Sequence, residues 1–162
     1  MHSGVELPGL RTAADYQFGA GAGTALFPRT ESFSVERSRN GRPTKVSVAD
    51  GPRLVSVGAG ERFTLSPEGG RRLTEGLDAP AGRVVVGDES EPFVRDGKNV
   101  FAKFVTDVGP EIRARDEVAV VHEDGGVLAV GRAELDAGAM CDFESGVAVK
   151  VRAGVPEPEG ES

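Results

Sequence analysis

Apolar positions in the first part of the chain follow a helical spacing and then give way to short extended segments. Leu10, Ala14 and Phe18 recur every four residues, which places them on one face of a short helix. Two strand-like segments, 32–39 and 42–49, lie on either side of an Asn-Gly pair. Because Asn-Gly between such segments is the strongest short signal for a tight turn, we expect a β-hairpin here.

The next segments complete the same pattern. Residues 53–57 and 62–65 are again of extended type, and Ser66 followed by Pro67 has the character of a helix N-cap and first helical position. We expect that helix to end near Leu77. The first region is therefore predicted to be a small α+β unit, in which helices flank an antiparallel meander.

The second part of the chain consists mainly of short valine-rich runs. A polar stretch at 88–95 predicts a short helix, and a turn at Gly97 leads into a strand that carries two lysines. The final run alternates valine with small or basic residues, as a strand with two different faces does. Five or six strands of this length with one short helix predict a closed or nearly closed β pseudo-barrel. The runs are 83–86, 117–121, 127–133 and 146–152.

Small residues, proline and glycine cluster at 76–82 and mark a junction between the two regions. The predicted fold class is α+β, with an α+β domain at 10–80 followed by the pseudo-barrel at 83–153. We expect a flexible N-terminus at 1–9. The acidic, proline-rich tail at 154–162 is predicted to be disordered.

Taken alone, the charge balance argues against nucleic-acid binding. Asp and Glu number 26 against 19 basic residues, for a net charge of −7, whereas nucleic-acid binders usually carry a basic footprint. The chain is poor in lysine, and its acidic, Ala/Gly/Val-rich composition resembles proteins of salt-accumulating halophiles. At 1 M salt the Debye length is about 3 Å, so binding there depends on shape and close contacts rather than on net charge.

The cellular setting follows from what the sequence lacks. No run of eighteen apolar residues indicates a membrane span, and the N-terminus has no signal-peptide pattern. One cysteine, Cys141, excludes an internal disulfide framework, and we interpret it as a small core residue. We therefore expect a cytoplasmic protein that does not bind a membrane.

The turn at Gly97 is the leading candidate for a binding site. A glycine lets a phosphate or ribose approach the backbone, and Lys98 and Asn99 offer hydrogen-bond donors beside it. Val100 and Lys103 continue the segment. The alternative interpretation is structural, with the glycine permitting a positive φ and the apolar residues filling a core.

Two further groups of basic residues are candidates. Lys150 and Arg152 lie on the face of the last strand that we expect to be exposed, where they either contact RNA or discourage strand pairing. The densest positive stretch flanks the Asn-Gly turn and is a possible second contact for phosphate, although solvated charges at a hairpin look the same. Its residues are Arg37, Arg39, Arg42 and Lys45.

The chain offers little for catalysis. His122 next to Glu123 and Asp124 lies at an expected hairpin turn, where polar residues are common. A zinc site of the usual Cys/His type cannot be assembled from Cys141, His2 and His122. We predict no catalytic residue, no metal and no cofactor.

The second region resembles a PUA domain, a module found in archaeal and other RNA-modifying enzymes. The resemblance is carried by GKNVFAKFV at 97–105, RDEV at 115–118, LAVGRA at 128–133 and GVAVKVR at 146–152. The first region is similar to the domain that precedes PUA in archaeal tRNA-guanine transglycosylase and archaeosine synthase. That similarity is carried by ADYQFG at 14–19, GAG at 21–23 and LFP at 26–28, so the resemblance covers 10–153.

The resemblance implies an RNA-holding part without the chemistry of those enzymes, because the chain is too short for the transglycosylase barrel. The turn at Gly97 and the final strand would hold the acceptor end of a tRNA. The implied role is that of an accessory subunit, or a detached C-terminal half, in archaeosine modification of tRNA. The alternative is a protein–protein adaptor that docks a catalytic partner through the PUA surface.

Overall fold

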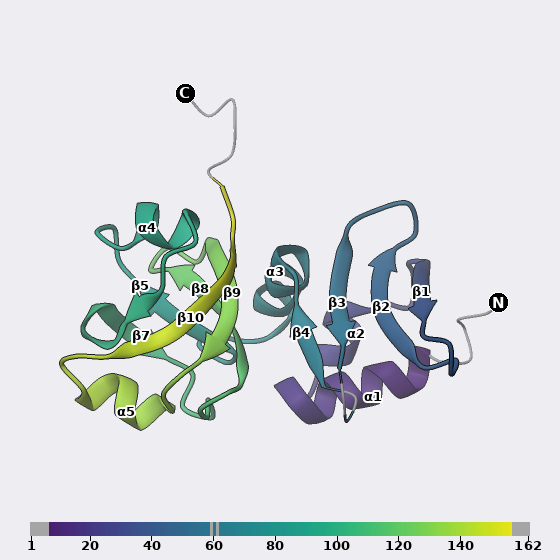
Figure 1. Cartoon of the computed structure of the whole chain (residues 1–162), viewed down its shortest axis with the longest axis horizontal. Coiled ribbons are helices and arrows are strands. Elements are labelled where there is room, and N and C mark those ends of the chain that lie inside the picture. The colour runs from purple at the N-terminus through teal and green to yellow at the C-terminus, as the bar shows by residue number, and fades with distance from the viewer. Residues whose placement is uncertain (1–6, 59, 61, 157–162) are drawn as a thin grey trace. The chain divides into compact units, whose positions relative to one another are not determined.

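The computed structural model divides the chain into two compact units, residues 1–78 and 79–162, and each is described by itself (Figure 1). The structure describes residues 7–58, 60 and 62–156. In this part of the chain no helix is long and apolar enough to cross a membrane.

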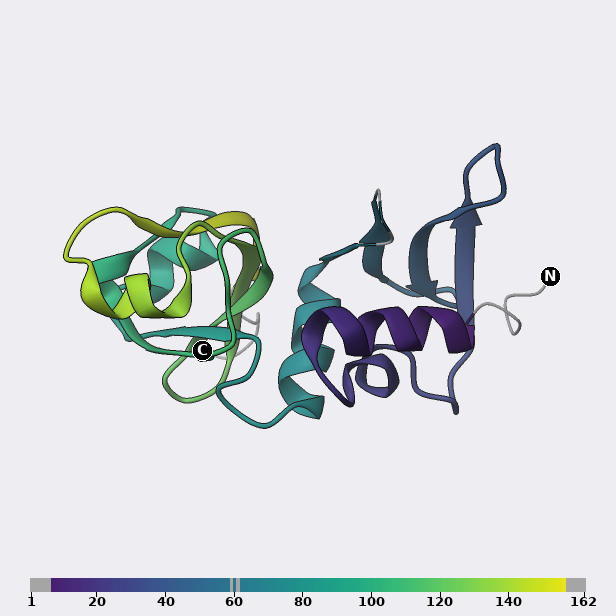
Figure 2. The same ribbon diagram turned by 90° about the horizontal axis from the view of Figure 1, so that it is seen from below.

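The first unit is the predicted meander with flanking helices. Its four strands form an antiparallel sheet in the order β1-β2-β3-β4. Helix α1 packs beside α2, as the view in Figure 2 shows. The elements are α1 (Leu7–Phe18), α2 (Ala22–Leu26), β1 (Phe33–Arg37), β2 (Pro43–Val48), β3 (Arg53–Val57), β4 (Phe63–Leu65) and α3 (Pro67–Gly76).

Phenylalanine rings form the centre of this unit. Phe27, Phe33 and Phe63 are buried, and the ring of Phe27 meets the other two edge-on at centroid distances of 5.7 and 6.2 Å. Leu10 and Ala14 of α1 are also buried, which confirms the apolar face predicted from their spacing. The predicted flexible segment 1–9 overlaps this helix at residues 7–9, and residues 1–6 lie outside the described part.

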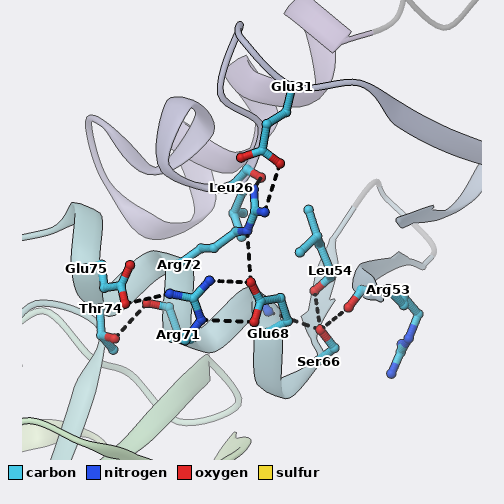
Figure 3. Close-up of polar contacts among 11 residues, drawn as sticks. Leu26, Glu31, Arg53, Leu54, Ser66, Glu68, Arg71, Arg72, Thr74 and Glu75 are labelled. Carbon is cyan, nitrogen blue, oxygen red and sulfur yellow. Dashed lines mark hydrogen bonds and ion pairs between the residues drawn. The ribbon is translucent and has the colours of Figure 1, made fainter. Parts of the chain in front are cut away.

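The start of α3 follows the sequence signal at Ser66. The Ser66 hydroxyl accepts a hydrogen bond from the Gly69 amide at 3.1 Å and donates to the Leu54 carbonyl at 3.0 Å, which ties the helix to β3 (Figure 3). Farther along α3, the guanidinium of Arg72 contacts the Glu31 carboxylate at 2.9 Å and the Leu26 carbonyl at 3.3 Å. The cap and this arginine together fix the helix to the rest of the unit.

The second unit is a six-stranded sheet in the order β6-β10-β9-β8-β5-β7. All neighbours are antiparallel except β5 and β8, which are parallel. In Figure 1 the long strand β10 crosses the front of the unit, with α4 on one side and α5 on the other. The elements are β5 (Arg83–Val86), α4 (Glu91–Arg95), β6 (Val100–Phe101), a 3₁₀ turn (Ala102–Phe104), β7 (Val105–Val108), β8 (Glu117–His122), β9 (Val127–Ala133), α5 (Ala137–Asp142) and β10 (Val147–Gly154).

The sheet curls into a nearly closed barrel. Strands β6 and β7 stand at opposite ends of the sheet order, yet the three-residue turn Ala102–Phe104 joins them. A connection this short brings the two sheet ends together, which confirms the predicted pseudo-barrel and the α+β class. Its core consists of aliphatic side chains, with Val84, Val120 and Leu128 among the fully buried ones.

Several local predictions are corrected by the structure. The strand expected to continue from Gly97 through Lys103 ends at Phe101, because the chain must turn there to cross from one end of the sheet to the other. Helix α5 was not predicted. The face alternation of the last strand is interrupted, because the register shifts between Val147 and Val149 and Ala148 turns into the core.

Regular contacts continue past residue 153, where the folded part was predicted to end. Strand β10 continues to Gly154, inside the segment 154–162 that was expected to be disordered. The Val155 amide donates to the Leu128 carbonyl at 2.8 Å, and the Arg95 guanidinium donates to the carbonyls of Val155 and Pro156. Residues 157–162 lie outside the described part.

Candidate nucleic-acid interface

The turn at Gly97 and the last strand lie side by side. Val100 of β6 is opposite Val149 of β10, and Phe101 is opposite Val147. Just before β6, the side-chain oxygen of Asn99 accepts a hydrogen bond from the Val151 amide at 3.0 Å. The two segments that the family resemblance implied as one site are therefore neighbours.

Backbone hydrogen bonds shape the turn itself. Gly97 has φ of +95°, a conformation that residues with a Cβ rarely adopt, and its amide donates to the Val94 carbonyl at 2.9 Å. The Lys98 amide donates to the Phe93 carbonyl, also at 2.9 Å, so the turn closes the C-terminal end of α4. A Cβ at Gly97 would meet nothing within 4 Å, which shows that backbone conformation and not crowding requires the glycine.

The lysines of the site are exposed but differ in their surroundings. Lys98 has 67% of its side chain exposed, and its Nζ lies 3.8 Å from the Asp96 carboxylate, a distance at which solvent weakens the attraction. Lys103 lies in the 3₁₀ turn, with its Nζ 5.2 Å from the centre of the Phe104 ring. Lys150 is exposed on β10.

Two of the predicted contact residues have structural roles. Val100 is 2% exposed and belongs to the barrel core, so its side chain is not on the surface. Asn99 uses its side-chain oxygen to hold β10, which leaves its amide nitrogen as the group that can donate elsewhere.

Arg152 is engaged by a buried carboxylate. Its Nη1 and Nη2 donate to the two carboxylate oxygens of Glu117 at 3.0 and 2.6 Å, in a bidentate pair that links β10 to β8 across β9. The Glu117 side chain is 6% exposed and that of Arg152 is 38% exposed. The main role of Arg152 in this geometry is therefore structural, because its ion pair holds β10 to β8.

The second basic group lies on the hairpin between β1 and β2 in the first unit. Arg39, Arg42 and Lys45 are exposed, but Lys45 is directly opposite Glu36 in the sheet register. Arg37 donates to the Gly41 carbonyl at 3.0 Å and so braces the turn. The hairpin presents positive charge, part of which is compensated locally.

His122 belongs to a histidine–carboxylate cluster whose members Asp88 and Glu91 were missed by sequence reasoning. The ring of His122 lies with its Nε2 at 2.5 Å from Asp88 and 3.9 Å from Glu91, and its Nδ1 accepts a hydrogen bond from the Asp124 amide at 3.0 Å. The hydrogen bond to Asp88 is the main reason that the pKa of His122 is raised, and the charges of Asp124 and Glu91 act in the same direction. The cluster joins the turn before α4 to the β8–β9 hairpin.

The contacts of both ring nitrogens favour the charged form of His122. Nε2 faces Asp88 and Glu91, whose ligand atoms and that of His122 lie within 4.8 Å of one another. Nδ1 has the Asp124 amide at 3.0 Å, from which the neutral ring accepts, and an Asp124 carboxylate oxygen at 3.3 Å, to which the protonated ring donates. Carboxylates around both nitrogens stabilise the imidazolium, in line with the raised pKa of His122.

The interpretation of Cys141 as a core residue is wrong. Cys141 lies in α5 and is exposed, whereas its neighbour Met140 is buried. Successive residues of a helix point about 100° apart, so a six-residue helix that buries Met140 turns the adjacent thiol outward.

Family comparisons match both units. Residues 82–155 match the PUA domain, and residues 9–80 match the patch-forming domain C2 of tRNA-guanine transglycosylase. The tRNA-guanine(15) transglycosylase of Methanothermobacter thermautotrophicus is 46% identical over 150 residues, which are 92% of this chain and 23% of that protein. The enzyme of the same name from Pyrococcus furiosus is 48% identical over 145 residues, which are 89% of this chain and 24% of that protein. The chain thus spans about a quarter of the length of these curated relatives.

Solved structures share the fold at lower identity. A hypothetical protein from Pyrococcus horikoshii OT3 has a TM-score of 0.73 at 23% identity, with 94% of this chain and 92% of that chain covered. A conserved PUA domain protein from Thermoplasma acidophilum has a TM-score of 0.62 at 23% identity, with 92% of each chain covered. From these matches and the geometry above, the chain is a PUA-domain protein that resembles the C-terminal domains of archaeal tRNA-guanine transglycosylase.

Proposed function

We propose that this protein binds tRNA without catalysing a reaction on it. Its role would be that of an accessory subunit, or of a detached C-terminal half, in the formation of archaeosine in tRNA. The PUA domain and the similarity to part of a tRNA-modifying enzyme support an RNA-related role. The tRNA specificity, the pathway and the absence of catalysis are the proposal.

The observation that carries the proposal is the pairing of the Gly97 turn with β10. It places exposed Lys98 beside a strand that presents Lys150, in a chain that has only four lysines among 162 residues. Phosphate groups accept charge-assisted hydrogen bonds from such side chains. A few contacts, each contributing about 1.5–3 kcal/mol net, give modest affinity, so we expect the protein alone to bind tRNA weakly.

Charge reversal tests the proposal. Lys98→Glu and Lys150→Glu, alone and together, are expected to weaken tRNA binding, measured by filter binding or fluorescence anisotropy at several salt concentrations. Arg53→Glu is the matched control, because Arg53 is exposed in the first unit, lies outside both candidate patches and changes the net charge equally. If tRNA affinity is the same for the double variant and the wild type, the proposed surface is wrong.

Nuclease treatment separates this function from the adaptor role. An RNA binder purified from its native lysate loses co-purifying macromolecules when RNA is digested, whereas a protein–protein adaptor keeps its partner. Retention of a stoichiometric protein partner after complete RNA digestion, together with no measurable affinity for tRNA, would favour the adaptor.

A further inference from the structure

The phenylalanines of the PUA domain lie outside its core. Among the described residues, the core cluster of this domain is wholly aliphatic, whereas the first unit buries three phenylalanines. Phe93, Phe101 and Phe143 are 62%, 45% and 51% exposed. A single exposed aromatic ring is ordinary, so what matters is which polar groups surround each one.

Phe101 lies on the outer face of the barrel next to basic residues. Val100 and Val149 are opposite each other and both face the core. In an antiparallel pair the residue before one is opposite the residue after the other, so Asn99 and Lys150 are opposite each other on the outer face. Phe101 follows Asn99 by two residues on the same face; it is opposite Val147, just beyond the register shift in β10, and lies diagonally from Lys150. Diagonal neighbours in a sheet are about 7–8 Å apart, within reach of long side chains.

The row continues onto the next strand with a second cation. Arg132 of β9 is directly opposite Lys150 in the register. Like charges in that position are unfavourable in the isolated sheet. The Glu134 carboxylate lies 3.2 Å from the Arg132 guanidinium and offsets part of this repulsion, but half of the Arg132 side chain is exposed. An exposed aromatic ring beside two opposed cations is suited to a ligand that has both flat apolar faces and negative charge.

The geometry points to Phe101 as a stacking platform for an unpaired nucleobase, with Lys150 and Arg132 binding the phosphates of the same strand. This inference rests on the proposed RNA binding and adds that the RNA is single-stranded where it crosses β6, β10 and β9. In a duplex the faces of the bases are covered by neighbouring bases, so the ring would have nothing to stack on. A purely apolar protein partner would not account for the two cations.

A tryptophan at position 101 allows base stacking to be measured directly by fluorescence. The chain contains no tryptophan, so Phe101→Trp introduces a single indole. Its fluorescence is expected to be quenched by a single-stranded oligonucleotide and to change much less with the same oligonucleotide annealed to its complement. Circular dichroism of the variant checks that the fold is kept, which the exposure of Phe101 favours.

Affinity measurements distinguish stacking from apolar contact. Phe101→Ala and Phe101→Leu should both weaken binding of the single strand by roughly 5- to 150-fold, because base–aromatic stacking needs a ring and leucine retains only apolar bulk. Phe101→Tyr should bind as the wild type does. The salt dependence should be unchanged in Phe101→Ala, whereas Lys150→Gln should reduce the slope of log K against log salt by about 0.7 per lost phosphate contact.

The outcomes separate this inference from the function on which it rests. If the wild type binds single-stranded and duplex RNA equally, or Phe101→Leu binds as the wild type does, the stacking platform is wrong and RNA binding stands. If the wild type binds neither RNA, both fail. If Phe101→Ala changes self-association in sedimentation and leaves RNA binding unchanged, the ring is a protein contact and the stacking platform is again wrong.

Discussion

Removing the Arg152 side chain should lower the free energy of unfolding of the PUA domain by more than it lowers the free energy of RNA binding. Arg152→Ala leaves the carboxylate of Glu117, which is 6% exposed, without its two charge-assisted hydrogen bonds. Loss of one partner of a buried ion pair costs about 3–5 kcal/mol. Because 38% of the Arg152 side chain is exposed and water can reach its place, we expect a loss at or below the lower end of that range, about 2–3 kcal/mol in the free energy of unfolding.

Urea denaturation followed by far-ultraviolet circular dichroism measures this loss. Arg132→Ala is the matched control: Arg132 lies on the neighbouring strand and pairs with Glu134 at the surface, where such pairs contribute about 0–1 kcal/mol. The double variant Glu117→Leu, Arg152→Leu should regain most of the stability, because a buried pair replaced by apolar residues costs little.

The RNA affinity of the same variants is a second test. At a temperature where all are folded, Arg132→Ala should bind a single-stranded oligonucleotide more weakly than Arg152→Ala does. The structural assignment of Arg152 is refuted if Arg152→Ala lowers stability by less than about 0.5 kcal/mol while removing RNA affinity, since changes below that size are typical of surface residues.

Three further predictions concern stability. Ser66→Ala should cost about 1–2 kcal/mol in urea denaturation, because the buried hydroxyl caps α3 and also donates to a carbonyl of β3, whereas Ser66→Thr, which keeps a hydroxyl, should retain part of both hydrogen bonds. Gly131→Ala should cost about 1–3 kcal/mol, because its Cβ would lie 2.3 Å from the Lys150 carbonyl and force β9 and β10 apart; an unchanged melting temperature would contradict this packing. The pKa of His122 is raised in the folded protein, so its stabilising effect is present below the ordinary value of about 6.5 and is lost as pH rises through the raised value. Melting temperatures measured across this pH range should show that dependence in the wild type and not in His122→Asn.

Local signals in the sequence predicted much of the fold. Ser66 with Pro67 located the start of α3, and the Asn-Gly pair located the hairpin between β1 and β2, because both features depend on residues within a few positions of one another. The pairing of the Gly97 turn with the last strand also followed from the family resemblance. Short elements without periodicity were missed: α5 has six residues, and its N-cap Asp136 was the one signal available.

The roles of individual charged residues could not be predicted in the same way. Arg152 was placed on an exposed face by alternation, but its partner Glu117 lies 35 positions earlier and only the folded sheet brings them together. His122 and Asp88, 34 positions apart, meet for the same reason. The break between β6 and β7 likewise arises from the closure of the sheet, and the local sequence of residues 102–104 does not predict it.

Among the described residues β10 is the last strand in sequence, yet it lies between β6 and β9 in the sheet. During synthesis on the ribosome, every other strand of the barrel emerges before the one that must be inserted between them. The surface formed by β6, β10 and β9 therefore cannot form before β10 has been made, and a nascent chain cannot capture a nucleic acid there before residues 147–154 have left the exit tunnel.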